Sequence, residues 1–179
     1  MPELTPDNLI RYGRLQADAS RRYEPAETDD PASGPPDEPD WVVSLSIWLK
    51  ARDTLRTRRH PVAILLEPDA EPSDLLENGS RTIDATGIAF IAVNFPTYTD
   101  GRGYSIAQIL RTHYGWRGEL RAVGDVLIDT IHYQARCGFD SFAVKPGHDP
   151  VKALHALKTF SHHYQQGYMK PVEPELAGA

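Results

Sequence analysis

The chain has 179 residues, a formal net charge of −6 at pH 7 and a single cysteine. The length is sufficient for one domain with its own core, and the acidic balance argues against binding to the phosphate backbone of nucleic acid. One cysteine excludes an internal disulfide and any metal or iron–sulfur site built only from cysteines of one chain. The first residues lack the basic and apolar regions of a secretory signal, and no segment has the roughly 20 apolar residues that a membrane helix needs. We therefore expect a cytoplasmic protein with no membrane partner.

The first 40 residues are expected to flank the domain. Within segment 1–23, residues 9–15 could form a small hairpin or an edge strand, with Gly13 as the turn residue. Segment 24–40 has five prolines, many acids and no large apolar side chain. It cannot bury enough surface to offset the entropy lost on ordering, so its composition predicts a flexible, dispensable linker or loop.

Residues 41–165 have the pattern of a single α/β domain, which a tail over 166–179 follows. An amphipathic helix near the start of the domain is indicated by apolar residues from Leu45 to Leu55. Short apolar runs bounded by glycine or proline then predict strands at 62–66, 88–93, 119–123 and 141–144. Helical segments are predicted at 73–78, 106–114, 126–137 and 150–164.

This alternation predicts an α/β fold with a mostly parallel sheet, because each strand is almost continuously apolar. The sequence does not give the strand order. We expect an open sheet with helices on both faces, and the alternative is a half (β/α) barrel. In either arrangement the loops that follow the strands lie at the carboxyl edge of the sheet, where ligands of such folds bind.

One of these loops, NFPTYTDGRGYS, places Asp100 and Arg102 beside two glycines. Ser105 with Gln108 fits a capping box, so we expect a helix to begin there. Arg102, Gly103 and Ser105 could then bind an anion through the guanidinium group and the free N–H groups of the first helical turn. The alternative is a structural loop in which Asp100 pairs with Arg102 or caps the turn.

The predicted helix at 126–137 carries a polar stripe with helical spacing, formed by Asp125, Asp129, His132 and Arg136. The stripe could contact a partner, or it could be a solvated face with surface ion pairs. Asp125 is expected to cap this helix at the carboxyl edge and is, with Asp100, a candidate acid or base.

Arg121 lies on a strand that we expect to be buried, so its charge needs a carboxylate partner. Asp100, Asp125 and Asp129 are candidates. If Arg121 reached the carboxyl edge, it would add to the anion site. Glu119 is the alternative partner, because the two residues share one face of the strand.

We expect no metal site in this chain. Cys137 precedes a glycine at the carboxyl end of its helix, where the helix dipole does not favour a thiolate, so a packed, inert thiol is expected. The histidines near the carboxyl terminus are too far apart to bind one ion together and are expected to be surface residues.

Two blocks, FPTYTDGRGYS and GELRAVGDVLIDTIHYQARCGF, resemble the signature of a bacterial family called domain of unknown function 934. The resemblance covers about residues 41–144 and leaves out segment 24–40. The matching polar positions are Asp100, Arg102, Ser105, Arg111, Glu119, Arg121, Asp125, Asp129, Arg136 and Cys137. Members of this family are generally encoded beside assimilatory sulfite or nitrite reductase and are sometimes labelled oxidoreductases. The resemblance therefore implies a pathway without specifying a reaction.

Two hypotheses of function follow. In the first, the protein is an accessory or anion-binding protein of sulfite or sulfate reduction, which binds a small oxyanion or docks on the sulfite or nitrite reductase. In the second, it is an enzyme, such as an oxidoreductase, that acts on a small anionic substrate, with Asp125 or Asp100 as acid or base and Arg102 as the anion clamp. The chain has no motif for a bound cofactor, so the identity of any cofactor stays open, as does the oligomeric state.

Overall fold

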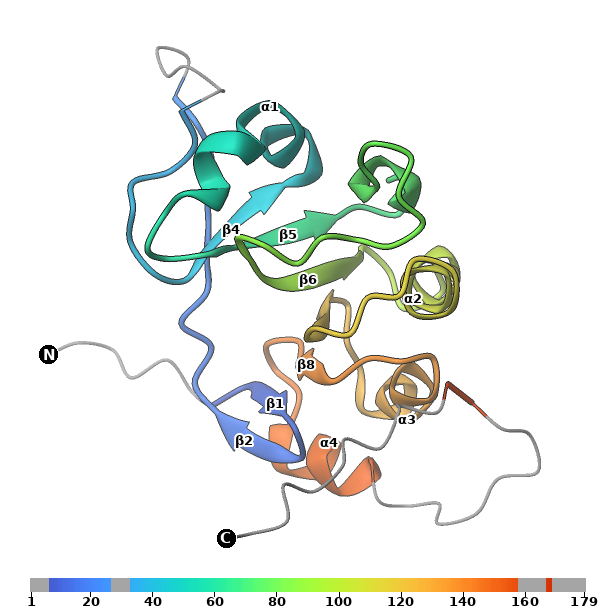
Figure 1. The fold of residues 1–179 in the computed structure, drawn as a ribbon. Helices are drawn as coiled ribbons and strands as arrows, with labels where there is room; N and C mark the ends of the chain where they lie inside the picture. The colour runs from blue at the N-terminus through green and yellow to red at the C-terminus, as the bar shows by residue number, and fades with distance from the viewer. Residues whose placement is uncertain (1–6, 27–32, 158–166, 169–179) are drawn as a thin grey trace, which may run out of the picture.

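The protein is built around an eight-stranded sheet (Figure 1). The computed structural model describes residues 7–26, 33–157 and 167–168. The strands are β1 (Leu9–Arg11), β2 (Arg14–Gln16), β3 (Arg21–Arg22), β4 (Trp41–Ser44), β5 (Val62–Leu66), β6 (Ile88–Phe95), β7 (Leu120–Gly124) and β8 (Ser141–Ala143). The helices are α1 (Leu45–Arg56), the short 3-10 helix η1 (Pro72–Leu75), α2 (Arg102–Thr112), α3 (Ile128–Arg136) and α4 (Pro150–Ala156).

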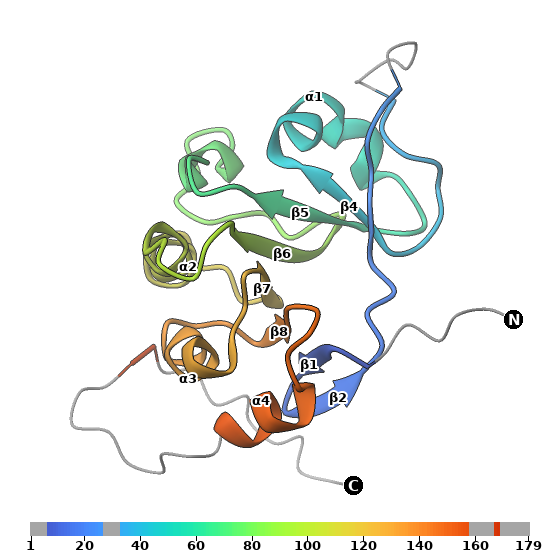
Figure 2. The same ribbon diagram turned by 180° about the vertical axis from the view of Figure 1, so that it is seen from behind.

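The order of the strands places the helices on one face. The sheet has the order β2-β1-β8-β7-β6-β5-β4-β3, and β3 to β8 are parallel neighbours in chain order, with β1 antiparallel to both β8 and β2. Because crossovers between parallel strands are right-handed, neighbours in chain order place every crossover on the same side. Figure 2 shows α1, α2 and α3 outside the curve of the sheet. The α/β class and the mostly parallel sheet are confirmed. The sheet adopts the alternative arrangement, the half barrel, in place of the open sheet with helices on both faces that we expected.

The sheet is strongly curled, as one short connection shows. The two edge strands β2 and β3 are joined by residues 17–20 alone. Five Cα–Cα steps span at most about 18 Å, whereas eight strands laid flat would be about 34 Å wide. The edges can be joined by this segment only because the sheet bends into a half barrel.

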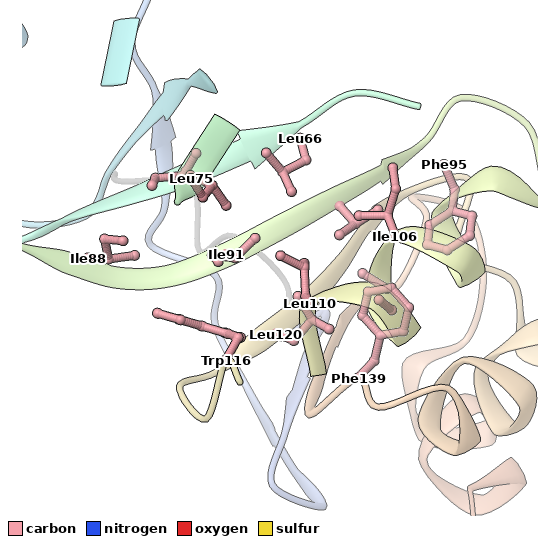
Figure 3. Packing of buried hydrophobic residues seen from close by; sticks show 14 of the residues in the cluster. Leu66, Leu75, Ile88, Ile91, Phe95, Ile106, Leu110, Trp116, Leu120 and Phe139 are labelled. Atoms are coloured by element: carbon pink, nitrogen blue, oxygen red, sulfur yellow. The ribbon is translucent and has the colours of Figure 1, made fainter. Parts of the chain in front are cut away.

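The larger core lies between the sheet and the helices (Figure 3). Side chains from the outer face of β6 and β7, such as Ile91 and Leu120, pack with Leu110 of α2 and with Trp116. Leu110 and Leu120 are completely buried, and each such burial contributes about 1.5–3 kcal/mol relative to exposure. This core fixes α2 and the strand ends that carry the polar residues described below.

A second, smaller core fills the inner face of the curl. It consists of Val42, Ala63, Leu65, Phe90 and Ala92, with Val123 against it. On the β7, β8 and β1 side the same face becomes polar, because the strand register aligns Ala92 with Arg121, Arg121 with Ser141 and Ser141 with Arg11. The inner face is therefore apolar across β4, β5 and β6 and charged across β7, β8 and β1.

Segment 33–40 departs from the linker prediction. Pro35 is buried, and the carboxylate of Asp37 accepts hydrogen bonds from the backbone N–H groups of Arg59 and His60. The guanidinium group of Arg58 donates to the carbonyl oxygens of Pro35 and Pro36. These contacts hold 33–40 against the loop between α1 and β5, although its composition contains almost no large apolar residue. Residues 27–32 of the predicted linker lie outside the described residues.

Two strands, β3 and β4, were not predicted from the sequence. The other differences concern the extent of elements. Residues 9–16 form an antiparallel hairpin in which Gly13 has φ +72°, a conformation that glycine adopts without strain. The predicted helix at 73–78 is reduced to η1, which starts at a proline. The predicted helix at 150–164 is α4 as far as Ala156, and its remainder, like most of the tail over 166–179, lies outside the described residues.

Candidate functional site

Polar residues follow the inner face of five consecutive parallel strands at their carboxyl ends. Each continues the inward-facing side of its strand, two positions after residue 42, 65, 92, 123 or 143. The five residues are Ser44, Glu67, Asn94, Asp125 and Lys145. We call this set the carboxyl rim. Because β4 to β8 are parallel neighbours, all five belong to the same end of the half barrel. This is the edge at which ligands of α/β folds bind, so the carboxyl rim is the candidate site.

Asp125 joins three loops of this edge. Its Oδ2 accepts the backbone N–H of Tyr98 at 2.7 Å, and its Oδ1 is 2.5 Å from Nζ of Lys145. The contact with Lys145 and, to a smaller extent, the hydrogen bond from the Tyr98 N–H hold the pKa of the Asp125 carboxyl below its ordinary value. Asp125 is therefore ionised at neutral pH and connects the loops after β6, β7 and β8.

The residue before Asp125 must be glycine for this loop to form. Gly124 has φ +90°, and a Cβ atom there would lie 2.5 Å from both the Asn94 side-chain oxygen and the Phe95 carbonyl oxygen. The chain bends at Gly124 so that the N–H of Asp125 can donate to the Phe95 carbonyl at 2.6 Å. Both strain and steric overlap exclude a larger side chain.

A second pair occupies the rim between β5 and β6. The side-chain amide of Asn94 donates to Oε2 of Glu67 at 2.6 Å, and Arg22 of β3 lies 3.5 Å from the other carboxylate oxygen. The carboxyl rim with Arg22 therefore contains two carboxylates and two cations. It can offer a cation to an anionic ligand only by releasing one of these internal pairs.

Arg102 lies in the loop and helix that follow β6, and Asp100 already binds it. Asp100 accepts the backbone N–H of Arg102 at 3.1 Å and receives its Nε and Nη2 at 3.0 and 2.7 Å. Arg102 holds the pKa of the Asp100 carboxyl below its ordinary value. The side chain of Arg102 is 61% exposed, so the pair is a surface feature, as the structural alternative predicts.

Helix α2 begins four residues earlier than the capping box predicts. Arg102 is its first residue and Ser105 is an exposed residue of its first turn, so the prediction that Ser105 caps the helix is wrong. The carboxylate of Asp100 instead binds the first helical N–H. Gly103 is buried, and a Cβ atom there would lie 2.7 Å from the Phe95 ring. Its role is thus close packing on β6.

Arg121 does not reach the carboxyl edge. It is buried inside the half barrel, where Nε and Nη2 donate to Glu119 at 3.0 and 2.8 Å and Nη1 donates to Asp18 at 3.1 Å. The alternative partner Glu119 is therefore the observed one, and Asp18 is a partner that the strand pattern could not indicate. The contact between Arg121 and Asp18 crosses 103 positions of the sequence.

The polar stripe on α3 lies mainly away from the rim. The helix begins at Ile128, and its first turn is closed by Thr130, so Asp125 does not cap it. Asp129 is exposed, whereas His132 and Arg136 are partly buried. Of the sequence-derived candidates, the structure brings Asp125 together with the loop that holds Asp100 and Arg102, and it places Arg121 and the α3 stripe elsewhere.

No group of three or more potential metal-binding side chains occurs within the described residues. Cys137 is buried, and burial raises the pKa of its thiol, as expected for a packed cysteine. Among the helices of the described ranges, none combines the length and apolar character needed to cross a membrane.

Comparison with known proteins identifies the family. A family model described as "Bacterial protein of unknown function (DUF934)" matches residues 63–174, which is more than half of the chain. The protein therefore belongs to this family, as the two sequence blocks predict. The match begins in β5 and includes Glu67, Asn94, Asp125 and Lys145. No curated protein and no solved structure matches the chain.

Sequence reasoning missed four residues of the rim, of which Ser44 ends a strand that was not predicted. Glu67, Asn94 and Lys145 each open a predicted strand-to-helix loop, but none belongs to a recognisable motif. The available signal was position: each stands where the inward-facing register of a strand continues beyond its last apolar residue. Only the sheet order shows that these positions lie side by side.

Proposed function

We propose that this protein is an accessory, anion-binding protein of assimilatory sulfite or sulfate reduction, and that it acts in the cytoplasm. The chain belongs to the family, and the pathway rests on what the family resemblance implies, namely genes beside assimilatory sulfite or nitrite reductase. The reductase is accordingly the proposed protein partner. A small oxyanion such as sulfite is the proposed ligand.

The observation that carries the anion-binding proposal is the pair formed by Lys145 and Asp125. The side chain of Lys145 is 47% exposed and that of Asp125 is 12% exposed, and Asp125 keeps the Tyr98 N–H as a partner when Lys145 leaves it. An oxyanion at the rim can therefore replace Asp125 as the partner of Lys145 at small cost. Arg102, paired with Asp100 at the surface, is a second cation of this kind in a neighbouring loop.

The same argument separates these cations from Arg121. Its side chain is only 5% exposed, against 47% for Lys145 and 61% for Arg102, and its partner Glu119 is 2% exposed. Removing a partner from a buried pair costs about 3–5 kcal/mol, so a weakly bound oxyanion cannot displace one. Arg121 is accordingly left out of the proposed anion site.

The enzymatic alternative receives less support from the geometry. Asp100 and Asp125 both have lowered pKa values and are each bound by a cation, so neither holds a proton that a general acid could donate at neutral pH. As bases they would first have to leave Arg102 or Lys145. A binding role also has to release one of these pairs, but it needs neither a proton donor nor a free base.

The binding experiment uses the full chain and titrates it with sulfite or sulfate while amide resonances are recorded by NMR. We expect saturable shifts in the loops after β6, β7 and β8, and loss of these shifts in Lys145→Met. Lys50→Met, at an exposed position of α1, is the matched control and should bind as the natural protein does. Unchanged binding by a folded Lys145→Met variant would refute the proposed site.

The pathway is tested in cells. Disruption of the gene should impair growth on sulfate as the sulfur source and leave growth on cysteine normal. Complementation with Lys145→Met should fail if the rim carries the function, whereas Lys50→Met should restore growth. Equal growth of the disrupted strain on both sulfur sources, also in a sensitised background, would remove the sulfur assignment.

A further inference from the structure

Asp125 is the fixed member of its pair with Lys145. Its side chain is 12% exposed against 47% for Lys145, and its Oδ2 accepts the Tyr98 N–H at 2.7 Å. The backbone N–H of Asp125 also donates to the Phe95 carbonyl at 2.6 Å. Lysine, in contrast, carries its charge at the end of a flexible four-carbon stem. When the pair opens, the ammonium group therefore moves and the carboxylate stays in place.

One oxygen of Asp125 depends on Lys145 alone. Among the described residues, Nζ of Lys145, at 2.5 Å, is the one donor to Oδ1 of Asp125. When an anion takes over the ammonium group, this oxygen keeps its negative charge and loses its donor. Because the side chain is only 12% exposed, water replaces the donor incompletely, and a charged acceptor without a partner is costly. The ligand itself has to supply the missing donor.

Other carboxylates at this edge keep their partners when Lys145 moves. Both oxygens of Asp100 receive donors from Arg102. Glu67 likewise has a partner at each oxygen. None of these contacts involves Lys145, so none is broken when its ammonium group turns to a ligand. Asp125 is therefore the acceptor that a ligand of Lys145 has to satisfy.

An oxyanion satisfies both side chains only if it carries a proton. One charged oxygen of such an ion accepts a hydrogen bond from the ammonium group of Lys145. An O–H group on the same ion donates to Oδ1 of Asp125, which gives a second charge-assisted hydrogen bond. A fully deprotonated oxyanion has acceptors only. It would place negative charge against the carboxylate without a proton between them, and like charges in contact repel each other.

We propose that Asp125 makes the anion site selective for oxyanions that carry an O–H group over oxyanions that carry none. Phosphate, hydrogen carbonate and hydrogensulfite belong to the first class, and sulfate and nitrate belong to the second. Lys145 supplies the positive charge, and Asp125 distinguishes the ions by their proton. This selectivity rests on the proposed function, because it requires an oxyanion at the carboxyl rim. Within the proposed pathway it favours hydrogensulfite over sulfate.

The test uses three tetrahedral probes of similar size, which separate the effect of the proton from that of the charge. At neutral pH every phosphate ion carries at least one O–H group, sulfate is a dianion without one, and methanesulfonate is a monoanion without one. Each probe is titrated into the full chain at constant ionic strength and followed by NMR. Because a site that hydrogen-bonds a ligand O–H rejects analogues that lack it, phosphate should bind at least about tenfold more tightly than either other probe.

A conservative variant connects this preference to Asp125. Asp125→Asn removes the charged acceptor, keeps an oxygen for the Tyr98 N–H and offers an N–H to any acceptor. The preference for phosphate over sulfate should therefore disappear in this variant. Asp53→Asn, at an exposed position of α1, is the matched control and should keep the preference. The melting temperature of each variant is measured in parallel, because a merely destabilised loop would weaken all three probes alike.

The possible results distinguish the selectivity from the anion site itself. If sulfate or methanesulfonate binds the natural chain as tightly as phosphate does, the selectivity is refuted and the anion site stands. An unchanged preference for phosphate in a folded Asp125→Asn variant has the same consequence. If neither sulfite nor any of the three probes binds, the anion site of the proposed function is wrong, and the selectivity is overturned with it.

Discussion

Arg111 is predicted to be the most important polar side chain for stability, because all five of its N–H groups donate hydrogen bonds inside the protein. Nη1 donates to the carbonyl oxygens of Trp116 and Gly118 at 2.9 and 2.8 Å, and Nε and Nη2 donate to that of Gly138 at 3.0 and 2.8 Å. Nη2 also binds Oδ2 of Asp140 at 2.6 Å. The side chains of Arg111 and Asp140 are 2% and 3% exposed, so solvent screens this pair very little.

The substitution Arg111→Met should therefore be strongly destabilising. Removing one partner of a buried ion pair costs about 3–5 kcal/mol, and the carbonyl oxygens left without donors would add to this cost. Because whole domains are stable by only about 5–15 kcal/mol, a large part of the folding free energy would be lost. In the melting temperature, about 4 kcal/mol corresponds to roughly 8–16 °C for a chain of this size.

Urea unfolding followed by circular dichroism measures the effect as a lower midpoint with an unchanged slope. Arg111→Lys should be intermediate, because lysine keeps the charge but has three donors and no planar fork. Arg117→Met, at an exposed position of the following loop, is the control and should change stability by less than about 0.5 kcal/mol. A cost below about 1 kcal/mol for Arg111→Met would refute the reasoning.

Two further predictions concern packing and pH. Gly103→Ala should destabilise the protein by about 1–3 kcal/mol, because its Cβ would lie 2.7 Å from the Phe95 ring. Gly101→Ala is the control and should be nearly neutral, because a Cβ there meets nothing within 4 Å. Equal melting temperatures for the two variants would contradict this reasoning. The N–H groups of Arg59 and His60 lower the pKa of Asp37 from 3.8 to about 2. Because the folded pKa lies below the unfolded one, the stabilisation by Asp37 is complete above about pH 4 and is lost as the pH falls toward 2. The melting temperature of Asp37→Asn should therefore approach that of the natural protein over this range, and a constant difference would show that Asp37 does not titrate as described.

The sequence alone determined the fold class and most of the elements. Continuous apolar runs such as 62–66 form strands in a parallel sheet because they are buried on both faces, and this depends on local composition. The family could also be recognised from the sequence, because its two blocks are continuous in the chain. In the candidate site, the pairing of Asp100 with Arg102 was predictable as an alternative, since only one residue separates them.

Tertiary structure decided which polar residues meet. Asp125 contacts Tyr98 and Lys145, at separations of 27 and 20 positions, because β6, β7 and β8 are neighbours in the sheet. Composition also misled for segment 33–40, where backbone contacts to Asp37 hold a chain that lacks large apolar side chains. The half barrel itself follows from strand order, and strand order depends on contacts between segments distant in sequence. Local patterns encode which residues form a strand and which face of it is apolar. The partner of a buried charge such as Arg121 is decided later, because Asp18, in the connection between β2 and β3, reaches the inner face only when the sheet curls.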